Sequence, residues 1–503
     1  MALGEPAVIG RLAAMAAVVD EDTEGVVVGQ LLEKAALELL AGMAATIDPK
    51  VQQAVAGCLT SLARAATPEQ TRLLCAGGAV TTLAMMVFST DGDVREQTFW
   101  ALGYIAAAST DGRDAVDGAE IIDALLSHAD AARERRLAVN GSGKPRPEPG
   151  FLEDQGVKAS GRFAGSHNWG RRLGRLAAAL ASGGPAPDYE KAVRLLPLLA
   201  ELLEEDDTEV LQHVLVPLAE MSAGSRERIR AVVQARGSVV PRLARLLTHP
   251  VPNVRALSLT AIANICSASA YVVTGDDSET QAVLDAGVLP LLLGFLHGDL
   301  EITGERLLIR RAVRVLANIC AGPRAQLAAV VGMDKSSRKT PTGRFFPLLL
   351  RILRDCDTDD MDIVEEVVWV FANASHGADR HLEKLVADGC VDALYRIFEL
   401  LVLRTAKLHA KAVAKAVAMA AEGEEPEIAM NSEPPTDCTD DEVVLVPALE
   451  GISVLLRATA DVANLAAQKE VTAAPANHPG IPVLSVTARM SGGSPSPCGC
   501  VSP

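Results

Sequence analysis

A tryptophan and an asparagine in the later part of the chain have the residue types and spacing best suited to recognition chemistry. Trp369 and Asn373 are four residues apart, so on a helix they lie one above the other on a single face. An indole face attracts the cationic end of a lysine or arginine by about 0.5–2 kcal/mol. A carboxamide both donates and accepts hydrogen bonds, so it can hold a peptide backbone. The pair can therefore contact a ligand, although a tryptophan can also simply pack in a core.

The segment around this pair predicts the elements that must position it. Val364 and Phe371 lie on other faces of the same helix, Gly377 ends it, and Gly389 separates two further amphipathic runs. Three short helices of this kind cannot bury their apolar faces alone and must stack on copies of themselves. The pattern is typical of an armadillo repeat.

Three asparagines place this unit in register with two others. Asn264, Asn318 and Asn373 each follow an alanine, in the sequences IANIC, LANIC and FANAS. Their separations exceed the roughly 40–47 residues of such repeats, and extra residues at Cys266–Tyr271 and in a basic loop account for the excess. We expect an all-α, right-handed superhelical solenoid of about eight armadillo repeats.

The organisation of the whole chain follows from these patterns. Residues 1–50 are expected to be helical, and repeats are expected over 51–460, with inserted loops at about 129–170, 334–344 and 402–440. Trp169 falls in the first insertion and is expected to have no role. The tail, 461–503, is expected to be flexible. A further alternative is that 129–170 and 402–440 are retained non-coding sequence.

Composition limits the classes of partner and the compartment. The 503 residues carry a net charge of −17, whereas nucleic acid and acidic membranes both need a basic surface. The nine cysteines are scattered, mostly within apolar runs, and show no metal-site spacing. The N-terminus lacks the basic start of a signal peptide, and no segment reaches transmembrane length. These features favour basic protein partners and a location in the cytoplasm or nucleus.

Catalytic patterns are not evident in the sequence. No phosphate-binding loop, Ser/His/Asp arrangement or pair of catalytic carboxylates occurs in a recognisable context, and His376 and His381 are five residues apart, which does not suit a metal pair. We therefore expect no enzymatic activity, no cofactor and no metal.

Several segments together resemble the importin-α family of armadillo adaptors, which carry nuclear-localisation peptides. They cover roughly residues 50–460 in the order of the family: Val94–Ile105, Ser225–Leu243, Val273–Leu284, Trp369–Gly377 and Ala448–Leu456. In that family a groove carries a ladder of Trp-x-x-x-Asn pairs. Indoles accept the stems of lysine or arginine, carboxamides hold the peptide backbone, and carboxylates at the slot ends pair with the charged heads.

The resemblance implies that the first, major peptide groove has lost most of its ladder. Trp100, with Gln97 before it, and Thr71 of the lysine pocket are retained, but Tyr104 replaces an asparagine and Ala108 an acidic residue. The neighbouring repeats carry other residues where the pair is expected: Cys58 and Leu62, Arg175 and Ala179, Val216 and Glu220. We expect weak or no peptide binding there.

The second, minor groove is better kept in the later repeats. The implied peptide-binding residues are Glu366, Trp369, Asn373, Asn318, Asn264, Val273, Thr274, Gly275 and Thr280. Arg314 stands where a tryptophan is expected and repels a basic peptide unless Glu366 or another acid neutralises it. The basic loop Lys335–Arg344 is expected to be a solvated insertion, although occupation of the groove by this loop is an alternative.

These observations predict an adaptor that binds basic nuclear-localisation peptides for import into the nucleus, mainly through the minor groove. Importin-β is a possible partner, but its basic N-terminal binding arm is not seen: the basic residues of 1–50 are Arg11, Lys34 and Lys50. The alternative is an armadillo scaffold that kept the fold but no longer carries nuclear cargo.

Overall fold

The computed structural model describes residues 5–21, 34–46, 48–119, 121–127, 168–236, 239–267, 277–332 and 345–375, and most of 384–407. All of these residues belong to one compact unit, Met1–Leu455. The predicted insertion at 334–344 and the tail at 461–503 lie outside the described residues, as do most of the insertions at 129–170 and 402–440.

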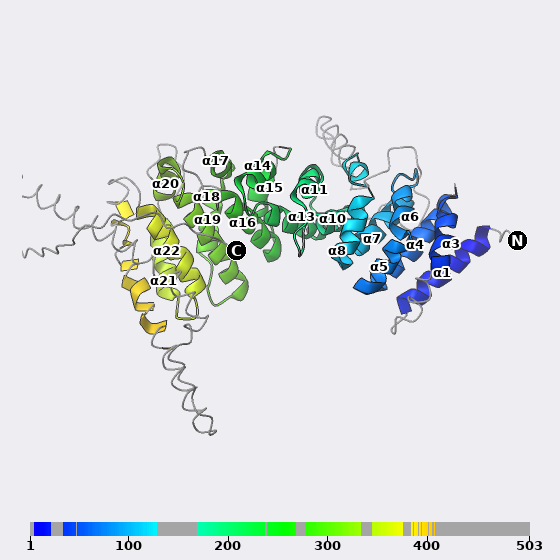
Figure 1. Ribbon diagram of the computed structural model, residues 1–503. Coiled ribbons are helices and arrows are strands. Elements are labelled where there is room, and N and C mark those ends of the chain that lie inside the picture. Colours follow the sequence, from blue (N-terminus) through cyan, green and yellow to red (C-terminus); the bar gives the residue numbers. More distant parts are fainter. Residues whose placement is uncertain are drawn as a thin grey trace, which may run out of the picture. The chain divides into compact units, whose positions relative to one another are not determined.

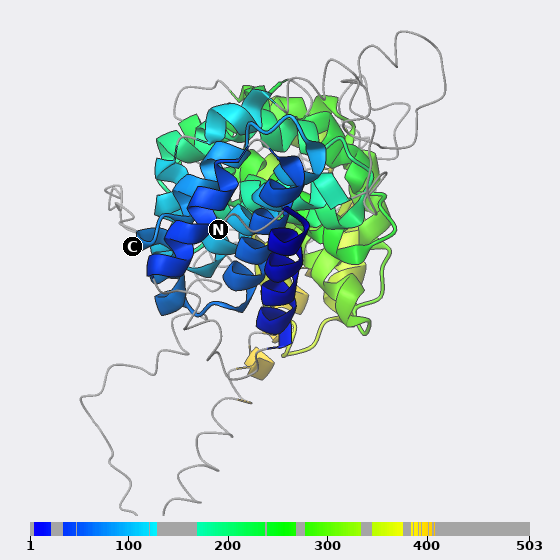
Figure 2. The same ribbon diagram turned by 90° about the vertical axis from the view of Figure 1, so that its right-hand side faces the viewer.

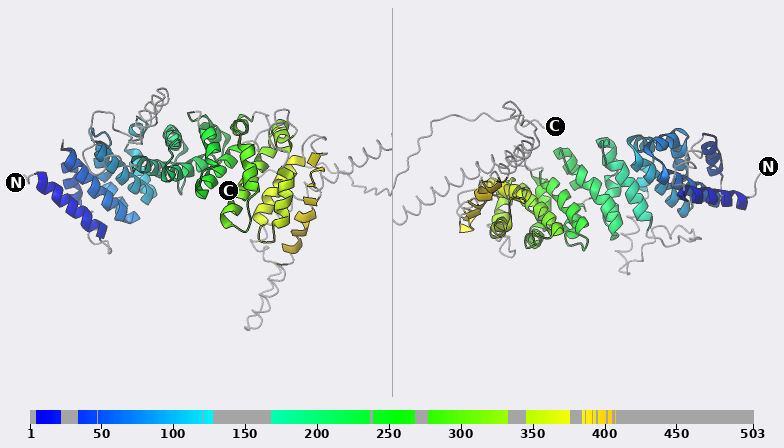
Figure 3. Two further views of the ribbon diagram at one scale, coloured as in Figure 1. Left: turned by 180° about the vertical axis from the view of Figure 1, so that it is seen from behind. Right: turned by 90° about the horizontal axis from the view of Figure 1, so that it is seen from below.

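Within the described ranges, eight long helices form a continuous row in this unit. Each of them packs on the next in chain order (Figures 1 and 3). Such a row buries the apolar face of every helix against its neighbours. The predicted all-α armadillo architecture is confirmed. The row consists of α1 (Glu5–Glu21), α4 (Pro49–Ala65), α7 (Gly92–Ala108), α10 (Asn168–Ala181), α13 (Thr208–Met221), α16 (Pro252–Cys266), α19 (Thr303–Cys320) and α22 (Met361–Ser375).

Shorter helices connect the long ones. In Figure 2 the molecule is seen from its N-terminal end, with the first helices in dark blue nearest the viewer. In one repeat Gly78 joins two short helices, and in a later repeat Gly287 does the same. Their φ angles are positive, 84° and 76°, a conformation that glycine adopts without strain. The short helices are α3 (Lys34–Ala44), α5 (Pro68–Ala76), α6 (Ala79–Met86), α8 (Thr110–Gly118), α11 (Tyr189–Arg194), α12 (Leu196–Leu202), α14 (Arg226–Gln234), α15 (Val239–Leu246), α17 (Ser278–Asp285), α18 (Val288–Leu296), α20 (Arg324–Val331) and α21 (Phe345–Asp355).

Aspartates fix the starting points of several long helices. Asp48, Asp91 and Asp207 are the N-caps of α4, α7 and α13, and each carboxylate accepts hydrogen bonds from free backbone N–H groups of the first turn. A cap of this kind contributes about 1 kcal/mol and sets the residue at which the helix begins. Each cap therefore sets the positions of the side chains along its own helix.

Trp169 corrects the predicted boundary of the first insertion. It was expected to lie in a loop, but α10 begins at Asn168 and the indole of Trp169 is buried, with its ring edge-to-face against Phe99 at a centroid distance of 5.0 Å. The polar residues that precede it hid the start of the helix in the sequence. The contact ties α10 to α7 across the insertion.

No single described helix is both long and apolar enough to cross a membrane. The pair α17 and α18 reaches that length and composition together, but the two helices meet at an angle of 72°.

Candidate peptide-binding surface

In most of the long helices, two residues four positions apart are exposed or partly exposed between buried neighbours. Around Asn318, the residues Val315–Ala317 and Ile319 are buried, while Asn318 itself is partly exposed and Arg314, one turn earlier, is exposed. The same pattern recurs in the long helices from α7 to α22, and in α4 the corresponding pair has a partly exposed first residue and a buried second one. We call these seven pairs the ladder row: Gly57/Ser61, Trp100/Tyr104, Arg175/Ala179, Val216/Glu220, Thr260/Asn264, Arg314/Asn318 and Trp369/Asn373.

The structure corrects the predicted pair in α4. Cys58 and Leu62 were expected in the ladder row, but both are fully buried in the core. Gly57, one residue earlier, is partly exposed, and an added Cβ there would meet no atom within 4 Å. Ser61, the second residue of this pair, is 8% exposed, slightly more than Leu62. The sequence prediction was off by one because neither a tryptophan nor an asparagine marks the register there.

The three asparagines of the ladder row each bind the preceding long helix. Asn264 Nδ2 donates to the carbonyl of Ala219 at 2.9 Å, Asn318 Nδ2 to that of Ala263 at 2.7 Å, and Asn373 Nδ2 to that of Ala317 at 3.0 Å. The accepting alanine always precedes the equivalent position of the earlier repeat. These bonds join adjacent repeats and fix the orientation of each amide. One N–H and the carbonyl oxygen of each side chain have no partner among the described residues, so they can still bind a peptide backbone.

Trp369 and Glu366 lie one turn apart on α22, and Glu366 faces Arg314 of α19. Trp369 is 38% exposed, so part of its indole faces solvent. Glu366 is buried one turn earlier on α22, and its Oε1 lies 3.8 Å from Arg314 Nη1. Burial raises the pKa of Glu366 to about 7, and the nearby Arg314 opposes that rise. Glu366 is thus the acid that faces Arg314, but it does so through a long ion pair and with a carboxyl group whose pKa is raised.

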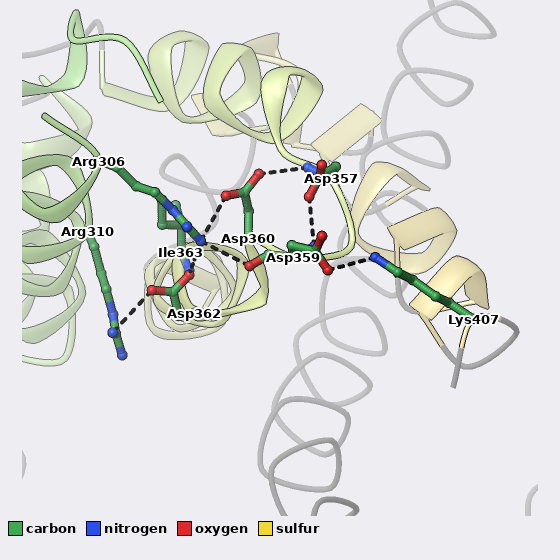
Figure 4. Close-up of polar contacts among 8 residues, drawn as sticks. All are labelled: Arg306, Arg310, Asp357, Asp359, Asp360, Asp362, Ile363 and Lys407. Atoms are coloured by element: carbon green, nitrogen blue, oxygen red, sulfur yellow. Dashed lines mark hydrogen bonds and ion pairs between the residues drawn. The ribbon is translucent and has the colours of Figure 1, made fainter. Parts of the chain in front are cut away.

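Acidic residues at the start of α22 are already paired with cations of the chain itself (Figure 4). Arg306 binds Asp360 and Asp362 at 2.9 Å each, Arg310 binds Asp362 at 3.2 Å, and Lys407 binds Asp359 at 2.7 Å. Because Asp359, Asp360 and Asp362 are compensated in this way, these three carboxylates add little to a negative field that could steer basic ligands.

The ladder row in α7 is covered by arginines from α10. The guanidinium carbon of Arg172 lies 4.1 Å from the centre of the Trp100 ring, and that of Arg175 lies 4.2 Å from the centre of the Tyr104 ring. Arg172 also forms a buried ion pair with Glu96 at 2.8 Å, in which both side chains are 9% exposed. These contacts have the chemistry expected of a bound basic peptide, a cation over an indole with a carboxylate at its end. Here the chain supplies the cations itself.

The remaining predicted contacts differ in accessibility. Thr71 and Thr280 are fully buried, and their hydroxyls donate to the carbonyls of Thr67 at 3.0 Å and Cys266 at 3.4 Å. The prediction that these threonines contact a peptide does not fit their burial. Gln97 is partly exposed on α7. Three further predicted residues lie outside the described part of the chain: Val273, Thr274 and Gly275.

Arg172 and Glu96 are the interacting residues that sequence reasoning missed. Arg172 follows an insertion, so its proximity to Trp100 was not visible from spacing along the chain. A usable signal was the cluster of arginines 171, 172 and 175 in an otherwise apolar helix. A single face of α10 cannot bury such arginines unless acidic or aromatic partners lie opposite.

The relatives detected by comparison are importin-α subunits. The chain is 29% identical over 276 residues to importin subunit alpha-1a of Oryza sativa subsp. japonica, which covers 55% of this chain and 44% of the relative. It is 30% identical over 244 residues to importin subunit alpha-3 of Arabidopsis thaliana, covering 48% and 38%. The chain thus matches less than half the length of these relatives. No protein-family model matches the chain.

One solved structure supports the fold. An engineered protein from a structural genomics consortium superposes with a TM-score of 0.57 at 21% identity, covering 90% of this chain and 97% of that one. A computationally designed armadillo-repeat protein for modular peptide recognition has 20% identity, a TM-score of 0.42, and coverage of 56% and 99%.

Proposed function

We infer that this protein is an importin-α-like armadillo adaptor that binds basic, extended peptides through the ladder row of α16, α19 and α22. The relatives support the family resemblance, and the grouping of Trp369, Glu366, Asn373 and Asn318 on adjoining helices supports the location. The single observation that carries the proposal is the partly exposed indole of Trp369 beside amides whose orientation is already fixed. Nuclear-localisation peptides are the ligands of that chemistry, and the cytoplasm and nucleus are the corresponding locations. The role is one of binding rather than catalysis.

Each residue of the site has a distinct task in this proposal. The indole of Trp369 packs on the stem of a lysine or arginine, and Glu366 pairs with its charged head. The amides of Asn264, Asn318 and Asn373 hold the peptide backbone. The proposed site leaves out the buried Thr71 and Thr280. It also excludes the Trp100/Tyr104 pair, where Arg172 and Arg175 already cover the aromatic faces; each pair of the ladder row is called a rung below. Peptide binding is therefore weaker and more sensitive to salt than with a complete ladder.

The test is a fluorescence-anisotropy titration with a labelled basic localisation peptide. We expect Trp369→Ala to weaken binding by on the order of 2 kcal/mol, or about 30-fold, if the indole is a hot spot. Phe398→Ala is the matched control, because this aromatic side chain is also exposed but lies outside the ladder row. Unchanged affinity in Trp369→Ala, or an equal loss in both variants, would remove the assignment.

A second candidate is an armadillo scaffold without nuclear cargo. It is favoured by the asparagines, whose bonds to Ala219, Ala263 and Ala317 give them a structural role without any ligand. A pull-down with an immobilised basic localisation peptide, with and without added importin-β, separates the two. A cargo adaptor is retained by the peptide, whereas a scaffold is retained in neither condition.

A further inference from the structure

One arginine of α19 differs from its neighbours in its contacts. Arg306 and Arg310 are held by the aspartates at the start of α22, and Arg311 Nη1 donates to the carbonyl of Ala256 at 2.5 Å. Arg314 is 57% exposed at its side chain and makes no hydrogen bond with any described residue; its contact is the 3.8 Å ion pair with Glu366. The guanidinium donors of Arg314 are therefore open to a ligand.

The position of Arg314 gives this open cation a place on the proposed peptide path. It is the ladder-row partner of Asn318, one turn away on α19, and Asn373 of the next helix binds the carbonyl of Ala317 at 3.0 Å. Trp369 occupies the equivalent position on α22. A peptide that runs along the amides therefore passes Trp369 at one rung and Arg314 at the next.

The two rungs have opposite preferences. The Trp369 rung, with Glu366, favours a lysine or arginine, whereas the Arg314 rung repels one and favours an acceptor of two parallel N–H bonds, a carboxylate or a phosphate. An anion bound to Arg314 also relieves its competition with the peptide for Glu366. The four groups then alternate in sign: the peptide anion is negative, Arg314 positive, Glu366 negative and the peptide lysine positive.

We propose that Arg314 makes this site selective for mixed-charge peptides, which carry an anionic side chain next to the basic residue held at Trp369. Packed helices lie about 8–10 Å apart and an extended chain advances about 3.3 Å per residue, so the anion lies roughly two to three residues from the lysine. This inference rests on the proposed peptide-binding function and names the ligand class of that same site.

The test compares labelled alanine-rich peptides that differ in one side chain. Each has one lysine and, two or three residues before or after it, aspartate, phosphoserine, alanine or a second lysine. We expect the best anionic peptide to bind on the order of tenfold more tightly than its two-lysine counterpart at low salt. The aspartate and phosphoserine arms tell which anion is preferred.

Charge reversal at Arg314 provides the decisive variant. Arg314→Glu is expected to invert the order, so that the two-lysine peptide binds more tightly, and thermal melting checks that this exposed substitution leaves the fold intact. Arg324→Glu, at an exposed position of α20, changes the net charge equally and is expected to keep the wild-type order. A two-lysine peptide that binds wild type as well as the anionic ones overturns the selectivity alone. Failure of every peptide to bind overturns the proposed function as well.

Discussion

The tryptophan rungs of α7 and α22 have the same helical register and opposite surroundings. Trp100 has Arg172 of α10 over its ring at 4.1 Å, with Glu96 closing a buried ion pair. Trp369 is 38% exposed, and no described cation lies over its indole. The first rung holds a basic side chain of its own chain, and the second leaves its indole open to a ligand.

This difference shows that a tryptophan of the ladder row can stabilise the fold in one repeat and be open to a ligand in another. In α7 the interactions that would grip a peptide instead join two neighbouring repeats, across a point where the chain carries an insertion. In α22 the joining is done by Asn373, whose amide binds α19, so Trp369 is not needed for it. The comparison predicts stability effects at the first site and binding effects at the second.

The largest effect is expected from loss of Arg172. Arg172→Ala breaks the buried ion pair with Glu96 and uncovers Trp100, which should lower the free energy of unfolding by about 3–5 kcal/mol. Arg194→Ala is the control, because Arg194 pairs with Asp123 at the surface, where the two side chains are 52% and 77% exposed, and such pairs contribute at most about 1 kcal/mol. Denaturant unfolding of both variants measures the difference. Equal losses would show that the arginine over Trp100 has no special role.

Acidification should weaken peptide binding at the second site. Glu366, with a pKa of about 7, faces Arg314 and Arg310 of α19 and lies near Asp362 and Glu365 of its own helix. A bound lysine favours the ionised carboxylate, so affinity should rise with pH and fall by up to about tenfold per pH unit below this pKa. Titrations of a histidine-free basic peptide between pH 8 and pH 6 measure this.

The matched variant for this pH dependence is Glu366→Gln. It removes the titrating group while keeping a side chain of similar size, so its affinity should be lower at pH 8 and nearly constant down to pH 6. A variant that keeps the wild-type slope would assign the pH dependence to another group.

The smallest effect distinguishes the two residues of the α22 rung. Asn373→Ala removes the bond to the carbonyl of Ala317 and should lower the free energy of unfolding by about 1 kcal/mol. It should also weaken peptide binding. Trp369→Ala should weaken binding more than Asn373→Ala does, and it also removes the packing of the covered part of an indole that is 38% exposed. Thermal unfolding and peptide titration of the two variants side by side check this, and a loss of stability in Trp369→Ala without any loss of affinity would make that tryptophan structural.

Sequence reasoning predicted the fold and part of the site for physical reasons. Helical periodicity placed Trp369 and Asn373 on one face, and the recurring Ala-Asn pairs gave the repeat register of α16, α19 and α22. It missed Ser61, because small residues carry no register signal, and it missed the contact of Arg172 with Trp100, because an insertion separates them in sequence. It also expected Thr71 and Thr280 to contact a peptide, because residue type alone does not reveal that both are fully buried.

Photo-crosslinking of a basic peptide tests the central claim most directly. A localisation peptide with a photoreactive group beside its lysine is irradiated with the protein, and mass spectrometry locates the attachment. We predict attachment within α19 and α22, near Asn318 and Trp369, and none within α7 or α10. Attachment beside Trp100 that persists in Trp369→Ala would contradict the account, because it would mean that a peptide displaces Arg172 and Arg175.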